Sequence, residues 1–489
     1  MTEKRLNILM IMADQFRLTT LDGMGDKIPT PNIKRIMDKG LVFTQSCCAC
    51  PLCTPSRAAL ATGKYPSRCG VPVHDAVLPP EQATYYQALR RAGYRVGVAG
   101  KSDLHKADQY CGKGDMPSMY HYGFTDPFET EGKMNSAWFK RGEDGAIRPN
   151  GPYQHYLVER DPARLEALNA DYKSYMREKR RFYAEPSVLP DEDFLDSFIG
   201  RAACDWLERV EDDVPWHYFV SFAGPHNPWD PPRENYEHFK DARLPPPIAD
   251  DFTGKPAWVK QRAAQETGGM TAQQALNVRR CYAASVEVVD QWVGQLLDIL
   301  ERRGLKDNTV VIFCADHGEM LGDHLMFQKA KPFQGSIRVP LFISGPERYV
   351  GKHGTVCTDL AELRDVMPTL LELAGAPIPE TVDGTSLLHP VEREYLHGEH
   401  TLGEDSMHFI LTKEDKYIWY SQTGRELYFN LRDDPHETKN VLEENQKRVA
   451  ELRALLIDAL KNREEGYTDG HTLLVGKTPV TVLQHTEVL

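Results

Sequence analysis

A short stretch near the N-terminus contains four of the chain's ten cysteines. Cys47, Cys48, Cys50 and Cys53 are followed at once by Thr54-Pro55-Ser56-Arg57. The spacing Cys50-x-x-Cys53 suits a zinc or iron–sulfur site, but such a site needs a second Cys or His pair, and none follows closely. The other cysteines are scattered along a long chain, which does not indicate a disulfide framework. The pattern therefore favours a setting for one reactive cysteine over a metal site.

Polar side chains with catalytic or metal-binding chemistry follow the ends of four apolar runs. They are Asp14, Lys101 with His105, His226, and Asp316 with His317. The carboxyl ends of parallel strands lie at one edge of a sheet, so we expect these side chains to converge. Two carboxylates at one place repel unless a cation lies between them, which predicts a hard divalent ion such as Ca²⁺ or Mg²⁺. His317 adds an imidazole, a ligand that softer metals prefer.

The same residues also have plainer interpretations. Asp14 and Asp316 could cap the helices that follow them. His226 stands in a proline-rich loop and could be structural, although its place after a buried strand favours a role as ligand or acid. Several such positions at one predicted edge favour the functional interpretation over separate structural roles.

The apolar runs predict strands, and helical patterns separate them. Leu6–Ala13 is a continuous apolar run, typical of a strand buried on both faces. A helix should begin at Pro31. Further strands are predicted at 94–99, 217–222 and 309–315, with helices at 83–92, 194–210 and 275–303. This alternation predicts an α/β fold over residues 1–390, with helices flanking a large, mostly parallel mixed sheet.

Three parts of the chain depart from that pattern. Residues 106–190 are polar and rich in aromatic side chains, and we expect an irregular insertion over the edge of the sheet. Residues 391–469 contain short strand patterns and one helical pattern, which predict a smaller C-terminal α+β subdomain with an antiparallel sheet. The tail, 470–489, alternates apolar residues, which suggests a contact with another subunit of a homo-oligomer.

The composition is globular with an acidic balance. Hydrophobic residues make up 41% and charged residues 26%, and the net charge is −13. This balance argues against nucleic-acid or anionic-membrane partners, which need basic surfaces. A small anionic substrate would require local positive charge. The run Leu6–Ala13 is too short for a membrane span or a signal peptide, so we expect a cytoplasmic protein with no membrane association.

Cys53 opens a longer pattern, CTPSRAALATGKYP, and further segments extend it in order along the chain. Together they resemble the sulfatase family, formylglycine-dependent hydrolases of the alkaline phosphatase superfamily with a C-x-P-S-R modification motif. The other matching segments are Asn7–Gln15, Thr30–Asn32, Gly93–Lys101, Pro225–His226, Ala315–His324, Lys329, Ser336–Leu341 and Glu426–Asn440. Ordered matches along nearly the whole chain are specific, and they imply an alkaline phosphatase-like fold.

The resemblance implies that a maturation enzyme converts Cys53 to formylglycine. One hydroxyl of the hydrated aldehyde attacks the sulfur of a sulfate ester, and the other, once deprotonated, expels the sulfate. The implied arylsulfatase-type reaction cleaves an alkyl, aryl or sugar sulfate to an alcohol and inorganic sulfate. The implied cofactor is a divalent cation, Ca²⁺ first, with Mg²⁺ or Mn²⁺ as alternatives.

The resemblance also implies roles for the neighbouring residues. Arg57 holds a formylglycine hydroxyl, and Lys101 and Lys329 stabilise negative charge in the transition state. His226 is the expected general acid, and His105 is the expected base for sulfate release. The expected metal ligands are Asp14, Gln15, Cys53, Asp316 and His317. The expected contacts of the small sulfated substrate are Lys101, His226, Lys329 and, from its place after the histidine loop, Trp229.

Three positions depart from the commonest family pattern. Gln15 stands where many members have Asp, and His317 where many have Asn, which resembles the phosphonate monoester hydrolases and choline sulfatases. His105 is displaced by two positions from the histidine of the family's Gly-Lys-Trp-His. The first alternative function is therefore a phosphonate monoester or phosphodiester hydrolase that uses the same formylglycine. The second is a binding protein whose Cys53 is never oxidised.

Overall fold

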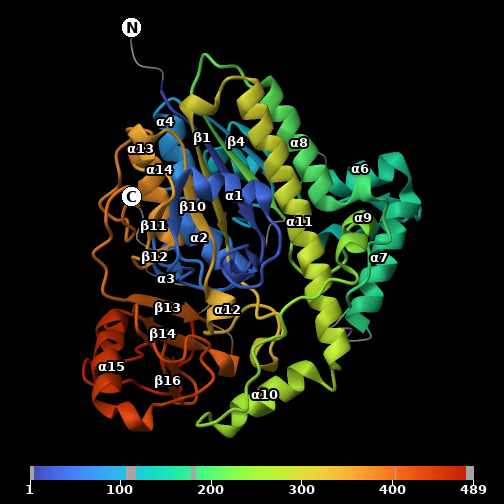
Figure 1. Cartoon of the computed structure of the whole chain (residues 1–489). Coiled ribbons are helices and arrows are strands. Elements are labelled where there is room, and N and C mark those ends of the chain that lie inside the picture. Colours follow the sequence, from blue (N-terminus) through green and yellow to red (C-terminus); the bar gives the residue numbers. More distant parts are fainter. Residues whose placement is uncertain (1–4, 106–116, 178–182, 402, 481–489) are drawn as a thin grey trace.

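The computed structural model describes residues 5–105, 117–177, 183–401 and 403–480 (Figure 1). Its centre is an eight-stranded sheet. In spatial order the strands are β11 (Thr355–Cys357), β2 (Gly40–Phe43), β10 (Leu341–Ser344), β9 (Thr309–Ala315), β1 (Asn7–Ala13), β8 (Trp216–Phe222), β4 (Arg95–Gly100) and β5 (Asp126–Glu129). β9, β1, β8, β4 and β5 are parallel, and β10 is antiparallel to both neighbours. The predicted large, mostly parallel mixed sheet is confirmed.

Helices cover both faces of the sheet. One layer contains α1 (Pro31–Asp38), α8 (Leu195–Arg209) and the long α11 (Ala272–Arg302), and the other contains α2 (Cys53–Thr62), α4 (Tyr85–Arg91) and α14 (Val366–Leu373). Every residue of β1, β8 and β9 is buried, as expected for strands that are covered on both sides. None of the described helices is both long enough and apolar enough to cross a bilayer.

The region 106–190 is more regular than the sequence indicated. Its described part contains α5 (Pro117–His121), α6 (Pro152–Arg160) and α7 (Pro162–Arg177), and β5 forms the edge of the main sheet. Both α6 and α7 begin with proline, which suits the first turn of a helix. Tyr153 and Tyr156 pack α6 against Phe198 of α8, so the aromatic residues attach this region to the sheet layer.

A separate four-stranded antiparallel sheet forms the smaller C-terminal part of the chain, drawn in orange to red in Figure 1. It consists of β13 (Leu396–His400), β14 (Met407–Leu411), β15 (Asp415–Tyr420) and β16 (Glu426–Asn430), with α15 (Gln446–Leu460) on one face. Apolar side chains of α15, including Leu452 and Leu456, pack on Tyr417 and Trp419 of the sheet. The predicted antiparallel subdomain is confirmed.

The start of the tail lies on this same subdomain. The Leu474 N–H donates to Tyr467 O, and the Gly476 N–H donates to Ser421 O. Residues 478–480 form no strand, and 481–489 lie outside the described residues. Contact of the tail with another subunit therefore stays a prediction.

Short elements complete the described chain. They are β3 (Ser46–Cys47), α3 (Pro66–Cys69), β6 (Lys140–Arg141), β7 (Ile147–Arg148), α9 (Arg233–Phe239), α10 (Ala257–Thr267), α12 (Gln334–Ile337), α13 (Glu347–Val350) and β12 (Ala361–Glu362).

Buried histidines lie where β13 meets the main domain. The Glu399 N–H donates to Ala49 O in the cysteine-rich stretch, which joins the two parts. His400 is 2% exposed, and neither of its ring nitrogens has a hydrogen-bond partner among the described atoms. Burial lowers the pKa of His397 and of His400 to about 4 in each case. Both imidazoles are therefore neutral near pH 7, and protonating either of them opposes folding.

We predict that the stability of this junction falls as the pH drops from about 6.5, the ordinary histidine pKa, towards about 4. Because the unfolded chain binds the proton more tightly, each histidine contributes a loss of about 3 kcal/mol over that window. His400→Leu should keep full stability at pH 7.5 and flatten this dependence, because no ring hydrogen bond is lost. Urea denaturation at several pH values checks this, and an unchanged pH slope in the variant would contradict it.

Candidate active site

Four adjacent strands deliver polar side chains to one edge of the main sheet. Asp316 follows β9, Asp14 follows β1, the loop with His226 follows β8, and Lys101 follows β4. Parallel strands present their carboxyl ends on the same side, so these side chains meet although they are far apart in sequence. The predicted convergence is thus present for these four residues.

Cys53 faces this edge from the first position of α2. The helix begins at Cys53 itself, and every residue in it is buried. Cys53 Sγ lies 2.9 Å from Lys329 Nζ, 3.2 Å from His317 Nε2 and 3.8 Å from Asp14 Oδ1. The positive end of the helix dipole adds to the field of the lysine, so this position favours an anionic group.

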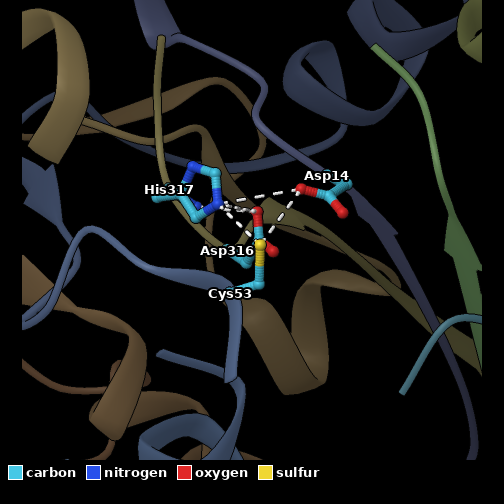
Figure 2. Close-up of side chains that lie close together, drawn as sticks. All are labelled: Asp14, Cys53, Asp316 and His317. Atoms are coloured by element: carbon cyan, nitrogen blue, oxygen red, sulfur yellow. Dashed lines mark hydrogen bonds and ion pairs between the residues drawn. The ribbon is translucent and has the colours of Figure 1, made fainter. Parts of the chain in front are cut away.

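Asp14, Cys53, Asp316 and His317 point toward one another and form a compact group of potential metal ligands (Figure 2). One ligand atom from each residue lies within 4.8 Å of the others, and all four residues are buried. His317 Nδ1 donates to Gly318 O at 3.0 Å, because a carbonyl can only accept. In neutral His317 this leaves the lone pair of Nε2 directed at the group, 3.7 Å from an oxygen of each aspartate.

Gln15 lies beside this group. Its backbone N–H donates to Asp316 Oδ1 at 3.0 Å, and its side-chain amide nitrogen donates to Glu319 Oε2 at 2.5 Å and to Asn227 Oδ1 at 3.2 Å. Its Oε1 is buried and has no hydrogen-bond partner among the described atoms. A buried amide oxygen without a partner, on a residue whose backbone contacts Asp316, is a neutral oxygen donor of the kind that hard cations bind.

The donor set fits a divalent ion. Asp14 and Asp316 offer carboxylate oxygens, His317 offers an imidazole nitrogen and Cys53 offers its sulfur. Gln15, whose backbone contacts Asp316, adds an unpartnered amide oxygen. The neighbouring Cys47, Cys48 and Cys50 are buried, but they are not members of the metal-ligand group found among the described residues.

Two cations offset the buried carboxylates. Arg57 Nε donates to Asp316 Oδ2 at 2.8 Å, and its Nη1 donates to Lys101 O at 2.6 Å and Ser221 Oγ at 2.8 Å. Lys101 Nζ forms an ion pair with Asp14 and lies 3.1 Å from Asp103 Oδ2. Burial alone would raise the pKa of Cys53, but Lys101, Lys329 and His317 lower it well below its usual value.

Lys329 and His226 form a close pair above Cys53. His226 Nδ1 donates to Asn227 O at 2.5 Å, so its Nε2 accepts a hydrogen bond from Lys329 Nζ at 2.7 Å. Burial and the nearby charge of Lys329 lower the pKa of His226. Lys331, the nearest alternative in sequence, instead pairs with Glu266 at 3.0 Å.

A cavity of about 440 Å³ opens onto these residues. Its lining includes Lys101, His226 and Lys329, as the sequence predicted. It also includes residues that sequence reasoning missed, namely His74, Lys133, Met134, Asn135, Tyr175, Met176, Asn227 and Gln328. A larger cavity of about 670 Å³ lies beside Trp206 and Tyr218. Its lining includes neither the potential metal ligands nor Lys101, His226 and Lys329, so it is a poorer candidate for the active site.

The structure does not bring His105 and Trp229 into the described lining of the smaller cavity. His105 Nε2 lies 2.5 Å from Glu129 Oε2 at the end of β5, so this ring is engaged at the sheet edge. Trp229 has no exposed surface and packs against Phe327 with a ring-centre distance of 5.9 Å. Of the described residues, His74 and His226 are the histidines that line the cavity.

Comparisons with known proteins agree with this geometry. The sulfatase family model matches residues 6–376, and the model of the C-terminal region of N-sulphoglucosamine sulphohydrolase matches residues 322–465. An arylsulfatase of Clostridium perfringens is 34% identical, over 98% of this chain and 99% of that protein. A choline-sulfatase of Rhizobium meliloti is 29% identical, over 91% of this chain and 83% of that protein.

The fold also has solved counterparts. The crystal structure of a phosphonate monoester hydrolase of Agrobacterium radiobacter superposes with a TM-score of 0.73, covers 94% of this chain and 95% of that one, and is 22% identical. At that identity the likeness concerns the fold, and it confirms the alkaline phosphatase-like architecture. Because a family model matches most of its length and a relative is 34% identical from end to end, this chain belongs to the sulfatase family of enzymes.

Proposed function

We propose that the protein is a sulfuric ester hydrolase that cleaves a sulfate monoester to an alcohol and inorganic sulfate, with formylglycine derived from Cys53 as nucleophile. The observation that carries this proposal is the position of Cys53. Its side chain lies at the positive end of α2, between the potential metal ligands and Lys329. The arylsulfatase and choline-sulfatase relatives support sulfate esters as substrates.

Formylglycine at position 53 would supply, as its hydrate, one hydroxyl to attack sulfur and a second to expel the sulfate. Asp14, Gln15, Asp316 and His317 would hold a divalent ion, which acts as a Lewis acid toward the nucleophile and the sulfate when bound. We favour Ca²⁺, with Mg²⁺ or Mn²⁺ as alternatives, because the ligand set is mostly oxygen.

Three basic residues of the site would hold the carboxylate in place and offset negative charge. Arg57, held between Asp316 and Ser221, fixes the carboxylate and keeps positive charge beside residue 53. Lys101 and Lys329 place ammonium groups where the sulfate oxygens gain negative charge in the transition state. These side chains are preorganised by buried hydrogen bonds, so little rearrangement is needed when substrate binds.

The proton for the leaving alcohol comes from the pair of Lys329 and His226. The two nitrogens lie 2.7 Å apart and line the cavity, so the proton between them can pass to an oxygen that leaves from sulfur. Burial and the charge of Lys329 lower the pKa of His226, which disfavours the imidazolium form and leaves Nε2 as a hydrogen-bond acceptor for Lys329. The role of His105 in sulfate release stays a prediction, as does a cytoplasmic location.

A phosphonate monoester or phosphodiester hydrolase is the second candidate. Gln15 beside Asp14, and His317 after Asp316, form the pattern that resembles the phosphonate monoester hydrolases. The His317 side chain belongs to the ligand group, and the Gln15 backbone contacts Asp316. We favour the sulfatase because the arylsulfatase of Clostridium perfringens matches the chain from end to end.

We expect matured protein to hydrolyse 4-nitrophenyl sulfate with a kcat/KM at least about 100-fold above that for a phenyl phosphonate monoester, a difference of about 2.7 kcal/mol in transition-state binding. Steady-state kinetics with both substrates at one pH measure the ratio. A preference for the phosphonate would reverse the assignment.

We expect the tryptic peptide 40–57 to be about 18 Da lighter than its unmodified mass when the chain is produced in a host with the maturation enzyme, because Cys53 becomes an aldehyde. Mass spectrometry of the digest measures the loss. Cys50→Ser should retain the loss and Cys53→Ala should abolish it. An intact Cys53 thiol in such a host would favour the inactive binding protein.

Lys329→Ala should lower kcat by roughly 100- to 1,000-fold, because a preorganised cation beside the reacting group is lost. Lys331→Ala is the matched control and should stay within about threefold of wild type, because its ammonium pairs with Glu266 instead. Circular dichroism verifies that both variants are folded. Near-normal turnover of Lys329→Ala would show that Lys329 has been misassigned.

A further inference from the structure

The backbone of Gln15 is held in an unusual conformation by hydrogen bonds to two neighbouring elements. Its φ is +64°, in the left-handed region that residues other than glycine seldom adopt. Its N–H donates to Asp316 Oδ1 at 3.0 Å, and its carbonyl accepts from Tyr282 Oη at 2.8 Å. These two contacts tie the residue to β9 and α11, so its side chain leaves the backbone in a fixed direction.

Glu319 determines which way round the Gln15 amide lies. A carboxylate can only accept, so the atom of Gln15 that lies 2.5 Å from Glu319 Oε2 must be the amide nitrogen. The second amide hydrogen goes to Asn227 Oδ1, and the Asn227 amide nitrogen in turn donates to Tyr175 Oη at 3.0 Å. The hydrogen-bond acceptors of Glu319 and Asn227 therefore determine which atom of the Gln15 amide is the nitrogen, although the two ends of an amide have nearly the same shape.

The other oxygen of Glu319 has its own partners. Oε1 accepts from the Leu321 N–H at 2.8 Å and from the Gln328 N–H at 2.5 Å. With the bond from Gln15, three donors surround a carboxylate that has no exposed surface. Glu319 is thus held through both of its oxygens, and it joins Gln15 to the segment that carries Lys329.

We infer that Glu319 is a positioning residue that makes Gln15 Oε1 available to the divalent ion. The inference rests on the metal site of the proposed function and deepens it. With its nitrogen bound to Glu319 and Asn227, Gln15 can offer only its oxygen, which is buried and unpartnered. If position 319 were an amide, it could donate as well as accept, and Gln15 could rotate to present N–H groups that a cation repels.

The inference is tested by calorimetric titration of metal-free protein with Ca²⁺, without any turnover. Glu319→Gln keeps the shape of the side chain, and we expect it to weaken Ca²⁺ binding by about 10- to 100-fold. Gln15→Ala should weaken binding as well. The double variant should bind as weakly as Gln15→Ala alone, because Glu319 acts through Gln15.

The double variant separates orientation from charge. If Glu319 acted only through its negative charge, Glu319→Gln would weaken binding equally when Gln15 is already alanine, and that result would overturn the inference. So would wild-type affinity in Glu319→Gln, or wild-type protein that binds none of Ca²⁺, Mg²⁺ and Mn²⁺. Thermal unfolding of the metal-free variants verifies that they are folded.

Glu266→Gln is the matched control. Glu266 contacts the same segment, through the Phe327 N–H at 3.4 Å and Lys331 at 3.0 Å, and neither of these contacts involves Gln15. The Glu266→Gln variant should bind Ca²⁺ with wild-type affinity. Hydrolysis of 4-nitrophenyl sulfate by the wild type, measured separately, tests the proposed function, so failure of one conclusion does not imply failure of the other.

Discussion

Two carboxylates, Asp14 and Asp316, are buried side by side at the ends of adjacent strands, and the rest of the site follows from this. Leaving one buried charge without its partner would cost about 3–5 kcal/mol, so each needs a fixed counter-charge. Lys101 comes from the end of β4 for Asp14, and Arg57 comes from α2 for Asp316. Because Arg57 is part of α2 and must contact Asp316, α2 packs against the edge of the sheet. Cys53, the first residue of this helix, therefore lies beside the carboxylates.

The chain is acidic as a whole, but the cavity at the candidate active site is lined by basic residues. The net charge is −13, yet three lysines and two histidines line the cavity, and none of its described lining residues is acidic. Carboxylates are abundant nearby, but they are turned inward to Lys101, Arg57 and the ligand group. A sulfate ester is thus attracted at short range by a molecule that would repel it at a distance, where salt screens the diffuse charge.

The strands and their terminal residues were predictable because buried strands are continuous apolar runs, and polar residues at their ends stand out. The start of α2 has no clear signal in the sequence, because its N-cap residue is Leu52, which has no side chain that could cap the helix. The contact of His105 with Glu129 could not be predicted, because Glu129 lies on β5, and no apolar run in the sequence indicates that strand. His74, Lys133 and Tyr175 reach the cavity from loops and helices whose placement depends on tertiary packing, so their types and spacing gave no signal.

The complete burial of α2 bears on the order of events during synthesis. Cys53 has no exposed surface, and its neighbours on the helix are enclosed as well. A second protein cannot reach this thiol once the helix has packed under the sheet edge. Any enzyme that oxidises Cys53 must therefore act on the nascent or still extended polypeptide, and folding closes the period in which the chain can be matured.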